Sequence, residues 1–492
     1  MKSLKREEVD VLLVGGGVFS ATLGALLIRA EPGLSIRVVE RLEGPALEAS
    51  SAWNNAGTGH AGLCELNYTP RGSAGGVDIS KALTIYEQFL QTQLFWAALR
   101  EEGALGDPRS FINSAPHMGF VRGARDVAFL KARHAALTRH HFFSDMEYSE
   151  EPEQIGRWAP LLAEGRNKGL VAATYSSEGT DVDFGSVASQ LLRDFETRGG
   201  DVRCNQEITS ISENTDGSWT ARVSSREGDG GYEIRARRVF AGAGGWTLKL
   251  LRQAGLREVR GYGLLPVSGT FLASAEERIT GQHQVKVYGK APVGAPPMSM
   301  PHMDARVIEG KRSVLFGPFA GAIPKFLKQG SRWDLVQSLR PDNIWRLGAM
   351  GIQNLNLVTL LLRDLTADHG AKVDALREFM PSAREEEWHL ITAGQRAQIV
   401  KPDRKCGGKL TFGTEIISSQ NGTIAGVLGA SPGASTAVPI AVDVLERMFP
   451  QASSASWQRR LRDFKPADGR NLVADPVATA EFRGRIKVGL GL

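Results

Sequence analysis

The chain has 492 residues, 42% of them hydrophobic and 23% charged, and this composition excludes a disordered tail protein, a collagen-like repeat and a small disulfide-bonded scaffold. Lys and Arg number 59 against 54 Asp and Glu, and the net charge of +5 is spread along the chain, which argues against a nucleic-acid-binding protein. The cysteines, Cys64, Cys204 and Cys406, are far apart, so we expect no metal site and a reducing compartment.

The first predicted elements lie in an uncharged segment, residues 11–28, which has the length of a membrane span or a signal peptide. Three consecutive glycines at 15–17 interrupt it after a few strand-forming residues, and acidic residues precede it, so we reject both interpretations. We predict instead a buried strand at residues 9–14, a glycine turn and a helix at residues 18–29. The protein is therefore expected to remain in the cytoplasm.

The glycine turn has the spacing of a dinucleotide-binding fingerprint. It reads Gly15-x-Gly17-x-x-Ser20, in which the first glycine permits a tight turn and the second lets a pyrophosphate approach the start of the helix. A second strand, predicted at residues 35–39, ends at Glu40, near the spacing of an acid that binds ribose hydroxyls. This pattern predicts an α/β fold (α+β overall) with a Rossmann-like domain for FAD or NAD; a βαβ unit without a ligand is the alternative.

Later segments favour FAD over NAD. Strands and an amphipathic helix are predicted between residues 185 and 241, and they lead into a second glycine turn that lacks the GxGxxG spacing. Residues 426–437 are small throughout and precede a predicted helix at 438–448, whose N-terminus would place backbone N–H groups against the flavin ring. A plain loop before a C-terminal helix is the alternative for this segment. We expect one FAD site and no separate nicotinamide site.

Several longer motifs carry a resemblance to a known family. They are ERL at 40–42, SAWNNAGTGHAG at 51–62, ELNYTP at 65–70, KVYGK at 286–290, GAPPMSMPH at 294–302, LFGPF at 315–319, GQR at 394–396 and LGASPGASTA at 428–437. From residue 10 to residue 449 the chain resembles the malate:quinone oxidoreductase family.

The resemblance implies an activity, a cofactor and a location. It implies an FAD-dependent enzyme of the tricarboxylic acid cycle that oxidises (S)-malate to oxaloacetate by hydride transfer to flavin N5 and passes the electrons to a membrane quinone. The enzyme would touch the inner face of the cytoplasmic membrane peripherally. Its fold would be like that of D-amino-acid oxidase.

Two other functions stay open at this point. A related FAD-dependent 2-hydroxy-acid dehydrogenase or oxidase, for example of the L-2-hydroxyglutarate type, would differ in its substrate or in its use of oxygen. A non-catalytic FAD-binding protein or a tRNA-modifying protein of similar fold would share only the cofactor site. The sequence has no basic patch, which argues against the tRNA-modifying function.

Oxidation of malate needs a base for the hydroxyl proton and cations for two carboxylates. We predict His302, in a loop rich in Pro and Met, as the base; a hydrogen-bonded loop histidine is the alternative. Lys286, Lys290 and Arg396 are the predicted carboxylate anchors, with Tyr288 between the two lysines. Each of these cations could instead be an ordinary surface residue.

The glycine turns and the resemblance together predict the FAD contacts, and no metal is expected. The predicted contact residues are Gly15, Gly17, Phe19, Ser20, Glu40, Arg41, Ser51, Asn55, Gly57, Thr58, Gly59, His60, Ile208, Gly242, Gly244, Gly429, Ser431, Gly433, Ala434 and Ser435. His60 is also expected at the reacting part of the flavin ring, without a covalent bond to it.

The expected domain organisation is discontinuous. Residues 1–80, 171–260 and 390–450 would form the FAD-binding domain, and residues 81–170 and 261–389 a substrate domain on a mixed or antiparallel sheet. Residues 451–492 would form a C-terminal tail. The segment Phe319–Arg340 mixes aromatic and basic residues, which is typical of an interfacial membrane segment; a cationic helix packed on the substrate domain is the alternative.

Overall fold

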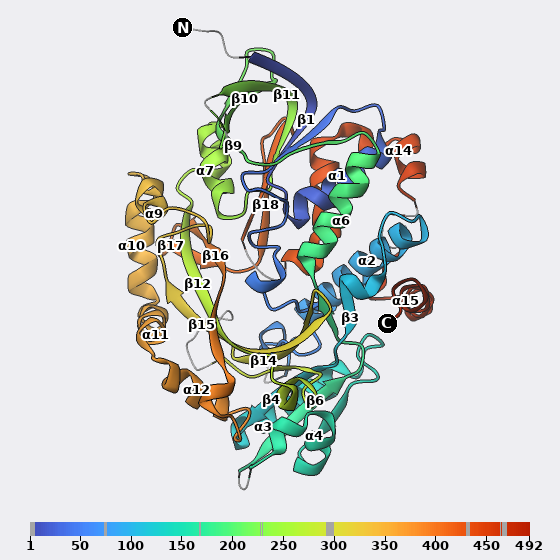
Figure 1. Ribbon diagram of the computed structural model, residues 1–492, viewed down its shortest axis with the longest axis vertical. Helices are drawn as coiled ribbons and strands as arrows, with labels where there is room; N and C mark the ends of the chain where they lie inside the picture. Colours follow the sequence, from blue (N-terminus) through green and yellow to red (C-terminus); the bar gives the residue numbers. More distant parts are fainter. Residues whose placement is uncertain are drawn as a thin grey trace.

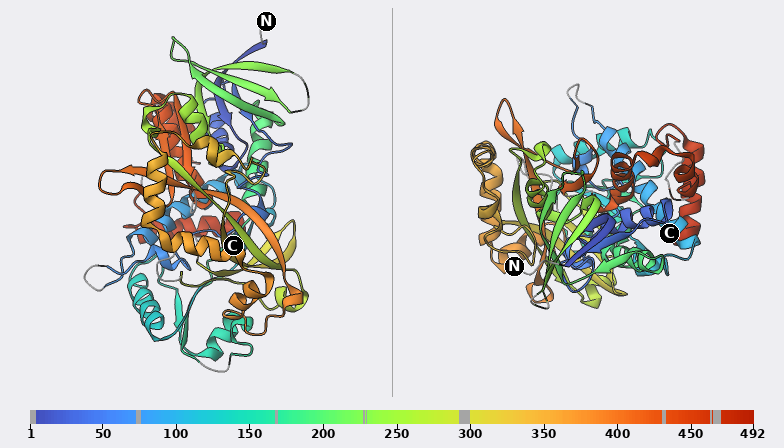
Figure 2. Two further views of the ribbon diagram at one scale, coloured as in Figure 1. Left: turned by 90° about the vertical axis from the view of Figure 1, so that its left-hand side faces the viewer. Right: turned by 90° about the horizontal axis from the view of Figure 1, so that it is seen from above.

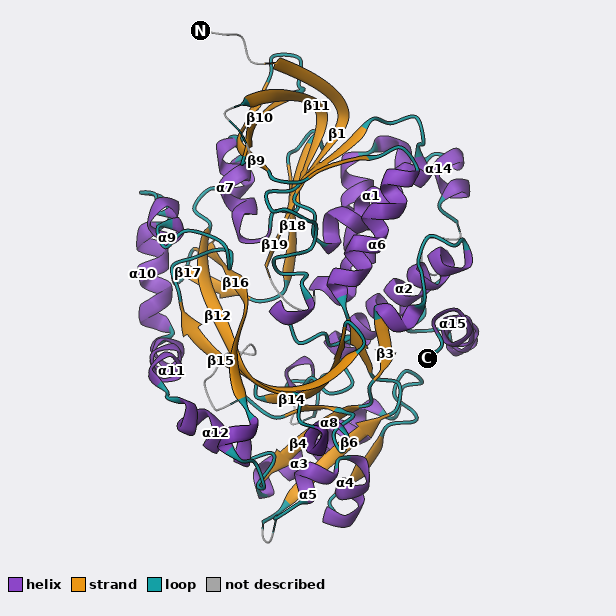
Figure 3. Ribbon diagram, viewed as in Figure 1, coloured by secondary structure: helices purple, strands orange, loops and turns teal. Residues whose placement is uncertain are grey.

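Two large β-sheets organise the chain, one above the other along the long axis of the molecule (Figure 1). The computed structural model describes residues 5–72, 76–166, 169–226, 228, 230–291, 300–429, 433–462, 464 and 470–492. Helices flank both sheets, as Figure 3 shows by separating helices from strands. This mixed α/β architecture agrees with the predicted fold class.

The upper sheet has eight strands. Five neighbouring strands are parallel, which is the arrangement of a Rossmann-like core, and three antiparallel strands extend it. The parallel strands are, in spatial order, β19 (Ile424–Gly429), β11 (Gly231–Ala241), β1 (Lys5–Val14), β2 (Ile36–Val39) and β8 (Asp201–Arg203). The antiparallel strands are β18 (Thr414–Ser418), β9 (Gln206–Glu213) and β10 (Trp219–Ser225).

The end of strand β1, residues 11–14, is buried on both of its faces. Val11 and Leu13 join a core with helices α1 (Val18–Ala30), α6 (Phe184–Thr197) and α13 (Ala437–Met448). Leu12 and Val14 point the other way, toward helix α7 (Thr247–Gln253). Because nearly every residue of α1 is buried among these elements, the helix is apolar all round, and this explains the uncharged segment without a membrane.

The lower sheet has nine strands and is mixed, as predicted. All neighbouring strands are antiparallel except β13 and β4, which are parallel. The spatial order is β17 (Gly407–Thr411), β16 (His389–Asp403), β12 (Gly263–Ser274), β15 (Lys311–Ala322), β14 (His302–Ile308), β13 (Lys286–Tyr288), β4 (His117–Arg122), β6 (Val171–Ser176) and β5 (Glu147–Ser149).

Helices cover the outer surface of the lower sheet at both ends (Figure 1). At one end lie α9 (Asp334–Ser338), α10 (Ile344–Gln353), α11 (Leu355–Thr366) and α12 (His369–Arg377). At the other end lie α3 (Ala124–Leu137), α4 (Pro152–Trp158) and α5 (Pro160–Ala163). The short helix α8 (Glu277–Thr280) lies between them.

The strand pairing shifts two segments relative to the expected domain division. Strand β6 begins at Val171 and strand β16 includes residues 390–403, and both segments were expected in the FAD-binding domain. Both strands pair within the lower sheet, β6 with β4 and β16 with β12, because each has its hydrogen-bonding partner there. A small separate sheet, β3 (Ile112–Ser114) with β7 (Thr180–Val182), lies next to them.

The C-terminal residues, expected as a tail, return to the body of the protein. Helix α14 (Ala455–Arg460) contacts α1, and helix α15 (Pro476–Leu490) packs on α2 (Ser80–Glu101). Gly489 lies so close to Ala97 that a Cβ there would be 2.8 Å from its methyl group. None of the helices in the described residues is both long and apolar enough to cross a bilayer.

Candidate active site

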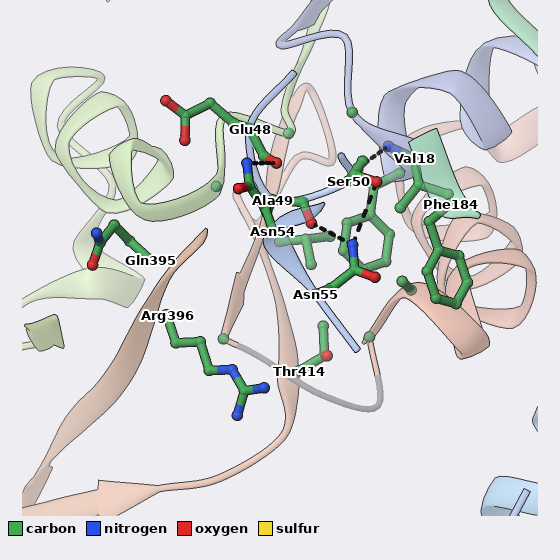
Figure 4. A pocket seen from close by; sticks show the side chains of 18 of the residues that line it. Val18, Glu48, Ala49, Ser50, Asn54, Asn55, Phe184, Gln395, Arg396 and Thr414 are labelled. Carbon is green, nitrogen blue, oxygen red and sulfur yellow. Dashed lines mark hydrogen bonds between the residues drawn. The ribbon is translucent and has the colours of Figure 1, made fainter. Parts of the chain in front are cut away.

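A cavity of about 340 Å³ lies between the two sheets and draws its walls from both (Figure 4). The upper sheet contributes its two glycine turns and the segment before α13, and the lower sheet contributes β13, β14 and β16. The predicted FAD contacts that line it are Gly15, Gly17, Phe19, Glu40, Arg41, Asn55, Gly57, Thr58, His60, Ile208, Gly242, Gly244, Gly429, Gly433, Ala434 and Ser435. The predicted cofactor site and substrate site are therefore one space.

Three predicted contacts do not line the cavity, and a fourth, Ser431, lies outside the described residues. Ser20 is buried beneath the second glycine turn, where a Cβ on Gly242 would meet its hydroxyl. Gly59 packs against Thr180 and leaves no room for a side chain. The carbonyl of Ser51 accepts a hydrogen bond from the Asn55 side chain at 2.8 Å. These three residues shape the cavity walls from behind.

The turn between β1 and α1 forms a cradle at one end of the cavity. Gly15 has a φ of +93°, and a Cβ there would lie 2.7 Å from the carbonyl oxygen of Gly242, so the turn requires glycine. Helix α1 starts after Gly17 without a side-chain cap, and Val18 N–H donates to the Ser50 hydroxyl at 3.0 Å. A glycine cradle at a helix start suits the pyrophosphate of a dinucleotide.

Glu40 lines this cradle and also holds it together. Its carboxylate accepts backbone hydrogen bonds from Gly16 at 2.6 Å and from Leu42 at 2.8 Å. Burial raises the pKa of Glu40, although these two bonds act in the opposite direction. The carboxylate thus fixes the turn while it faces the cavity, where the predicted contact with ribose hydroxyls would be made.

Several buried polar atoms around the cavity lack partners in the described part of the chain. They are Trp246 Nε1, Gln395 Oε1, Gln398 Oε1 and Asn67 Oδ1. Buried polar groups are nearly always hydrogen-bonded, so these atoms indicate a polar ligand in the cavity. Together with the glycine cradle they fit a large cofactor such as FAD.

Residues 54–60 and residue Ser435 form one connected wall. Ser435 accepts a hydrogen bond from His60 N–H at 3.0 Å and donates to the carbonyl of Thr58 at 3.1 Å. The side chains of Thr58 and Tyr288 meet at 2.8 Å, which joins this wall to the lower sheet. The start of α13 is thereby tied to the glycine-rich loop, as the predicted flavin contact requires.

His60 lies against a buried acid. Its Nδ1 is 2.5 Å from Oε1 of Glu65, a carboxylate with 1% of its surface exposed. Burial opposes ionisation of Glu65, but the hydrogen bond with His60 holds its pKa below the ordinary value. The imidazole edge also faces the rings of Tyr68 and Tyr288. His60 therefore has a fixed orientation at the cavity wall.

His302 lies in the cavity wall, but it is the first residue of strand β14 and not part of a loop. Its ring stacks on Tyr288 with centroids 4.5 Å apart, and its Nδ1 is 2.6 Å from Oδ2 of Asp304. Burial opposes ionisation of Asp304, but His302, Lys286 and Arg306 hold its pKa below the ordinary value. A histidine backed by a carboxylate is suited to accept a proton.

The two predicted lysine anchors lie outside the cavity. Lys286 is fully buried, and its ammonium lies 2.9 Å from Asp181 and donates to the carbonyl of Ala56 at 2.9 Å. Arg306 also binds Asp181, at 2.7 Å, so the three side chains form one ion cluster behind the loop. Lys290 pairs with Asp126. Strand β13 turns Lys286 toward these partners, which leaves no free cation there for a substrate.

Arg396, in strand β16, extends into the cavity (Figure 4). Burial lowers the pKa of its guanidinium, which the nearby hydroxyls of Tyr288 and Tyr68 partly offset. In the described residues no carboxylate pairs with it and no acceptor takes its hydrogen bonds. Arg396 is half-buried and its guanidinium faces the cavity without an acid partner in the described residues, so this arrangement suits an anionic ligand.

The sequence analysis missed three residues at this site. Lys81 of α2 lines the cavity, with its ammonium 4.7 Å from the centre of the Tyr68 ring and no ion-pair partner in the described residues. No sequence signal distinguishes it from the other lysines. Asp304 could have been found, because it stands two residues after His302 in a strand and so shares its face. Glu65 belongs to the ELNYTP motif but was not assigned a role.

Comparisons with known proteins identify the family. The family model for malate:quinone oxidoreductase matches residues 7–492. Among similar relatives are the probable malate:quinone oxidoreductases of Leifsonia xyli subsp. xyli, 49% identical over 97% of each chain, and of Kocuria rhizophila, 47% identical over 99% of this chain and 98% of the relative.

Solved structures show the same fold at low sequence identity. L-alpha-glycerophosphate oxidase from Mycoplasma pneumoniae with FAD bound has a TM-score of 0.58 at 14% identity, covering 90% of this chain and 95% of that one. Glycine oxidase from Bacillus cereus has a TM-score of 0.55 at 15% identity, covering 89% and 98%. The chain belongs to the malate:quinone oxidoreductase family, its cofactor is FAD, and its activity is the oxidation of malate with a quinone as electron acceptor.

Proposed function

We propose that the cavity binds FAD and (S)-malate side by side and that Arg396, His302 and Lys81 handle the substrate. The observation that carries this assignment is the unpaired guanidinium of Arg396, which lies in the same cavity as the glycine cradle and the His302–Asp304 pair. An anion that satisfies Arg396 would lie within reach of the residues that can move a proton.

FAD, when bound, accepts the hydride that leaves C2 of malate. The protein residues supply the other half of the reaction. His302 accepts the proton of the malate hydroxyl, and Asp304 stabilises the imidazolium that results. The stack of His302 on Tyr288 holds the ring in place, and Tyr288 is itself held by Thr58. His60, fixed by Glu65, orients the wall of the cavity next to the flavin.

The two carboxylates of malate require two cations. Arg396 binds the carboxylate next to C2, because a guanidinium can hold both oxygens and fix the direction of the C2–H bond. Lys81, whose ammonium lies near the Tyr68 ring, binds the distal carboxylate. Burial lowers the pKa of the Lys81 ammonium, and an anion beside it would favour the charged form. A monocarboxylate substrate would leave Lys81 unused.

We further propose that the protein works in the cytoplasm at the inner face of the membrane, because its quinone acceptor is held in the bilayer. The contact would be peripheral. Electrons would leave through the flavin alone, since one dinucleotide cradle lines the cavity and the second glycine turn lacks the spacing for another.

The decisive experiment is anaerobic reduction of the purified yellow protein. Addition of (S)-malate should bleach the flavin, and a ubiquinone analogue, but not NAD, should restore its colour. Bleaching by L-2-hydroxyglutarate in place of malate, or rapid reoxidation by oxygen with release of hydrogen peroxide, would favour the related 2-hydroxy-acid oxidase. No bleaching by either acid would contradict the proposed site roles.

A further inference from the structure

We propose that helices α9, α10 and α11 form a docking face for a bilayer containing anionic lipid and that quinone reaches the cavity past this face. The docking face is defined as the exposed side of residues 333–365 together with Phe412. The inference rests on the proposed function only for the identity of the acceptor. The surface itself is argued from exposure and charge.

The docking face concentrates exposed apolar side chains. Ten of the sixteen large apolar side chains that are exposed in the described residues belong to it. They are Trp333, Val336, Ile344, Trp345, Ile352, Leu355, Val358, Leu362, Leu365 and Phe412. Ile352 is 74% exposed and Leu355 is 61% exposed. Exposed apolar side chains concentrated on three consecutive helices are typical of an interaction site.

Helices α10 and α11 carry apolar residues on the side that packs on the protein and also on the exposed side. Leu357 and Leu361 of α11 are buried against Val267 and Ala320 of the lower sheet. The opposite side, which would normally be charged, is also apolar. Between residues 343 and 362 the single charged residue is Arg346, and its guanidinium donates to the carbonyls of Asp342 and Gly407.

The border of the docking face is basic. Six exposed cations lie in residues 330–366 and 404–413, both of which are fully described, and neither segment has an exposed acid. The cations are Arg332, Arg340, Arg363, Arg404, Lys405 and Lys409. Gln353, at the end of α10, donates to the carbonyl of Cys406 and so places the 404–409 cations beside the apolar surface. Apolar side chains edged by cations match the acyl and headgroup layers of an anionic bilayer.

A second copy of the chain is a poorer occupant of this surface. Two identical docking faces would bring six exposed cations against six others with no exposed acid in either segment to pair with them. Like charges at an interface disfavour association. Anionic lipid headgroups offer the opposite charge.

The docking face also touches the cavity. Phe412 is 42% exposed and lines the cavity together with Gly413 and Thr414. It follows strand β17, which packs against α10. A lipid-soluble acceptor in the bilayer would therefore have a short path, past Phe412, to the flavin side of the cavity. The left view of Figure 2 faces these helices, and Figure 1 shows α15 at the opposite, right-hand edge of the molecule.

This surface revises the membrane segment predicted from the sequence. Of the segment Phe319–Arg340, Phe326 is buried and Leu327 lines the cavity, while Phe319 belongs to strand β15. Trp333 and Val336 are exposed and belong to the docking face. The greater part of the docking face lies after residue 340.

The test compares vesicle binding by purified holoenzyme variants. The variant I352D/L355D places two charges on the docking face, and the control V477D/V488D places two charges on exposed residues of α15. On vesicles of phosphatidylcholine mixed with phosphatidylglycerol, we expect I352D/L355D to bind about tenfold more weakly or worse and the control to bind as the unmodified protein does. Equal binding by I352D/L355D, or equal loss in the control, would overturn the proposal.

The basic border is tested in the same assay. R404E/K405E should lose binding to the anionic vesicles severalfold, whereas the control K311E/R312E, at another exposed basic pair, should not. If the unmodified protein self-associates and I352D/L355D abolishes self-association without any change in vesicle binding, the face is an interface between copies and the proposal fails.

Two measurements separate this proposal from the proposed function and from misfolding. I352D/L355D should lose reduction of a long-chain ubiquinone in vesicles and keep malate-dependent reduction of a soluble dye. Absence of dye reduction in the unmodified protein would contradict the proposed function and leave the vesicle result valid. In the unmodified protein, brominated phosphatidylcholine should quench tryptophan fluorescence, and W333F/W345F should remove most of that quenching. Failure to observe quenching would overturn the docking face.

Discussion

Two groups of cations near the cavity differ in whether they have partners. Lys286 and Arg306 are fully buried, share Asp181 and bind backbone carbonyls of the glycine-rich loop. Arg396 and Lys81 line the cavity and have no acid beside them in the described residues. The first group has its acid within the protein, whereas the second has none in the described residues.

The difference shows how a functional cation is distinguished in a chain with 59 Lys and Arg residues. Lys286, Lys290 and Arg396 all belong to the family motifs. Membership in a motif therefore does not tell which of them stabilises the loop and which binds the substrate. The presence or absence of a neighbouring acid makes this distinction. Asp181 and Asp126 neutralise the two lysines, whereas no described acid neutralises Arg396. A cation of the first kind should matter for stability, and one of the second kind for substrate affinity.

The largest effect on stability is expected from Lys286→Met. Loss of one partner from a buried ion cluster should lower the free energy of unfolding by about 3 kcal/mol, because Asp181 and Asp304 lose part of their compensation. Urea denaturation measures this, and Lys290→Met, at a partly exposed pair, is the matched control. The fraction that retains FAD should keep its KM for malate. Normal stability together with a raised KM would show that Lys286 binds the substrate.

Arg396→Ala should lower the affinity for malate without lowering the stability of the protein. We expect the KM for malate to rise about a hundredfold, since a buried carboxylate would lose its charged partner. FAD content and Tm should not fall, because the substitution removes a half-buried cation that has no acid partner in the described residues of the free protein. Steady-state kinetics and thermal melting check both parts. An unchanged KM would show that Arg396 does not bind the substrate.

Asp304→Asn tests the proton-accepting pair by its pH dependence. The pKa of Asp304 is held below the ordinary value, so the carboxylate is ionised across the neutral range and stabilises a protonated His302. Without that charge the imidazole loses its proton more readily, and the acid limb of kcat/KM should move to lower pH, while kcat falls about tenfold or more. A purely structural role would lower Tm and leave the acid limb in place.

The smallest effect is expected from Lys81→Gln. Because Lys81 is exposed, loss of its charge should raise the KM for malate about tenfold at low salt and less at high salt. Turnover of a monocarboxylate such as lactate should not change, because no distal carboxylate is present. Lys131→Gln, at an exposed ion pair, serves as control. An equal effect on both substrates would show that Lys81 does not bind the distal carboxylate.

Local elements could be predicted well from the sequence. The strand at 9–14 and the helix at 18–29 correspond to the end of β1 and to α1, and the helix predicted at 438–448 corresponds to α13. These elements follow from hydrophobic period and from glycine positions, which act over a few residues. His302 was misplaced in a loop, because the Pro and Met residues before it obscured the start of β14.

The sequence by itself determined the family, the cofactor, the unit of β1, α1 and β2, and the cavity-lining glycines, because each is marked by residues close together in the chain. Only the tertiary structure decided what each charged side chain does. Asp181 reaches Lys286 from 105 residues away, and Lys81 meets the cavity that holds Arg396 from 315 residues away. Whether a buried cation is neutralised depends on such distant partners, and electrostatic energy depends on separation in space. Which apolar side of α10 and α11 is buried and which is exposed is likewise a property of packing, which no pattern within the helices reveals.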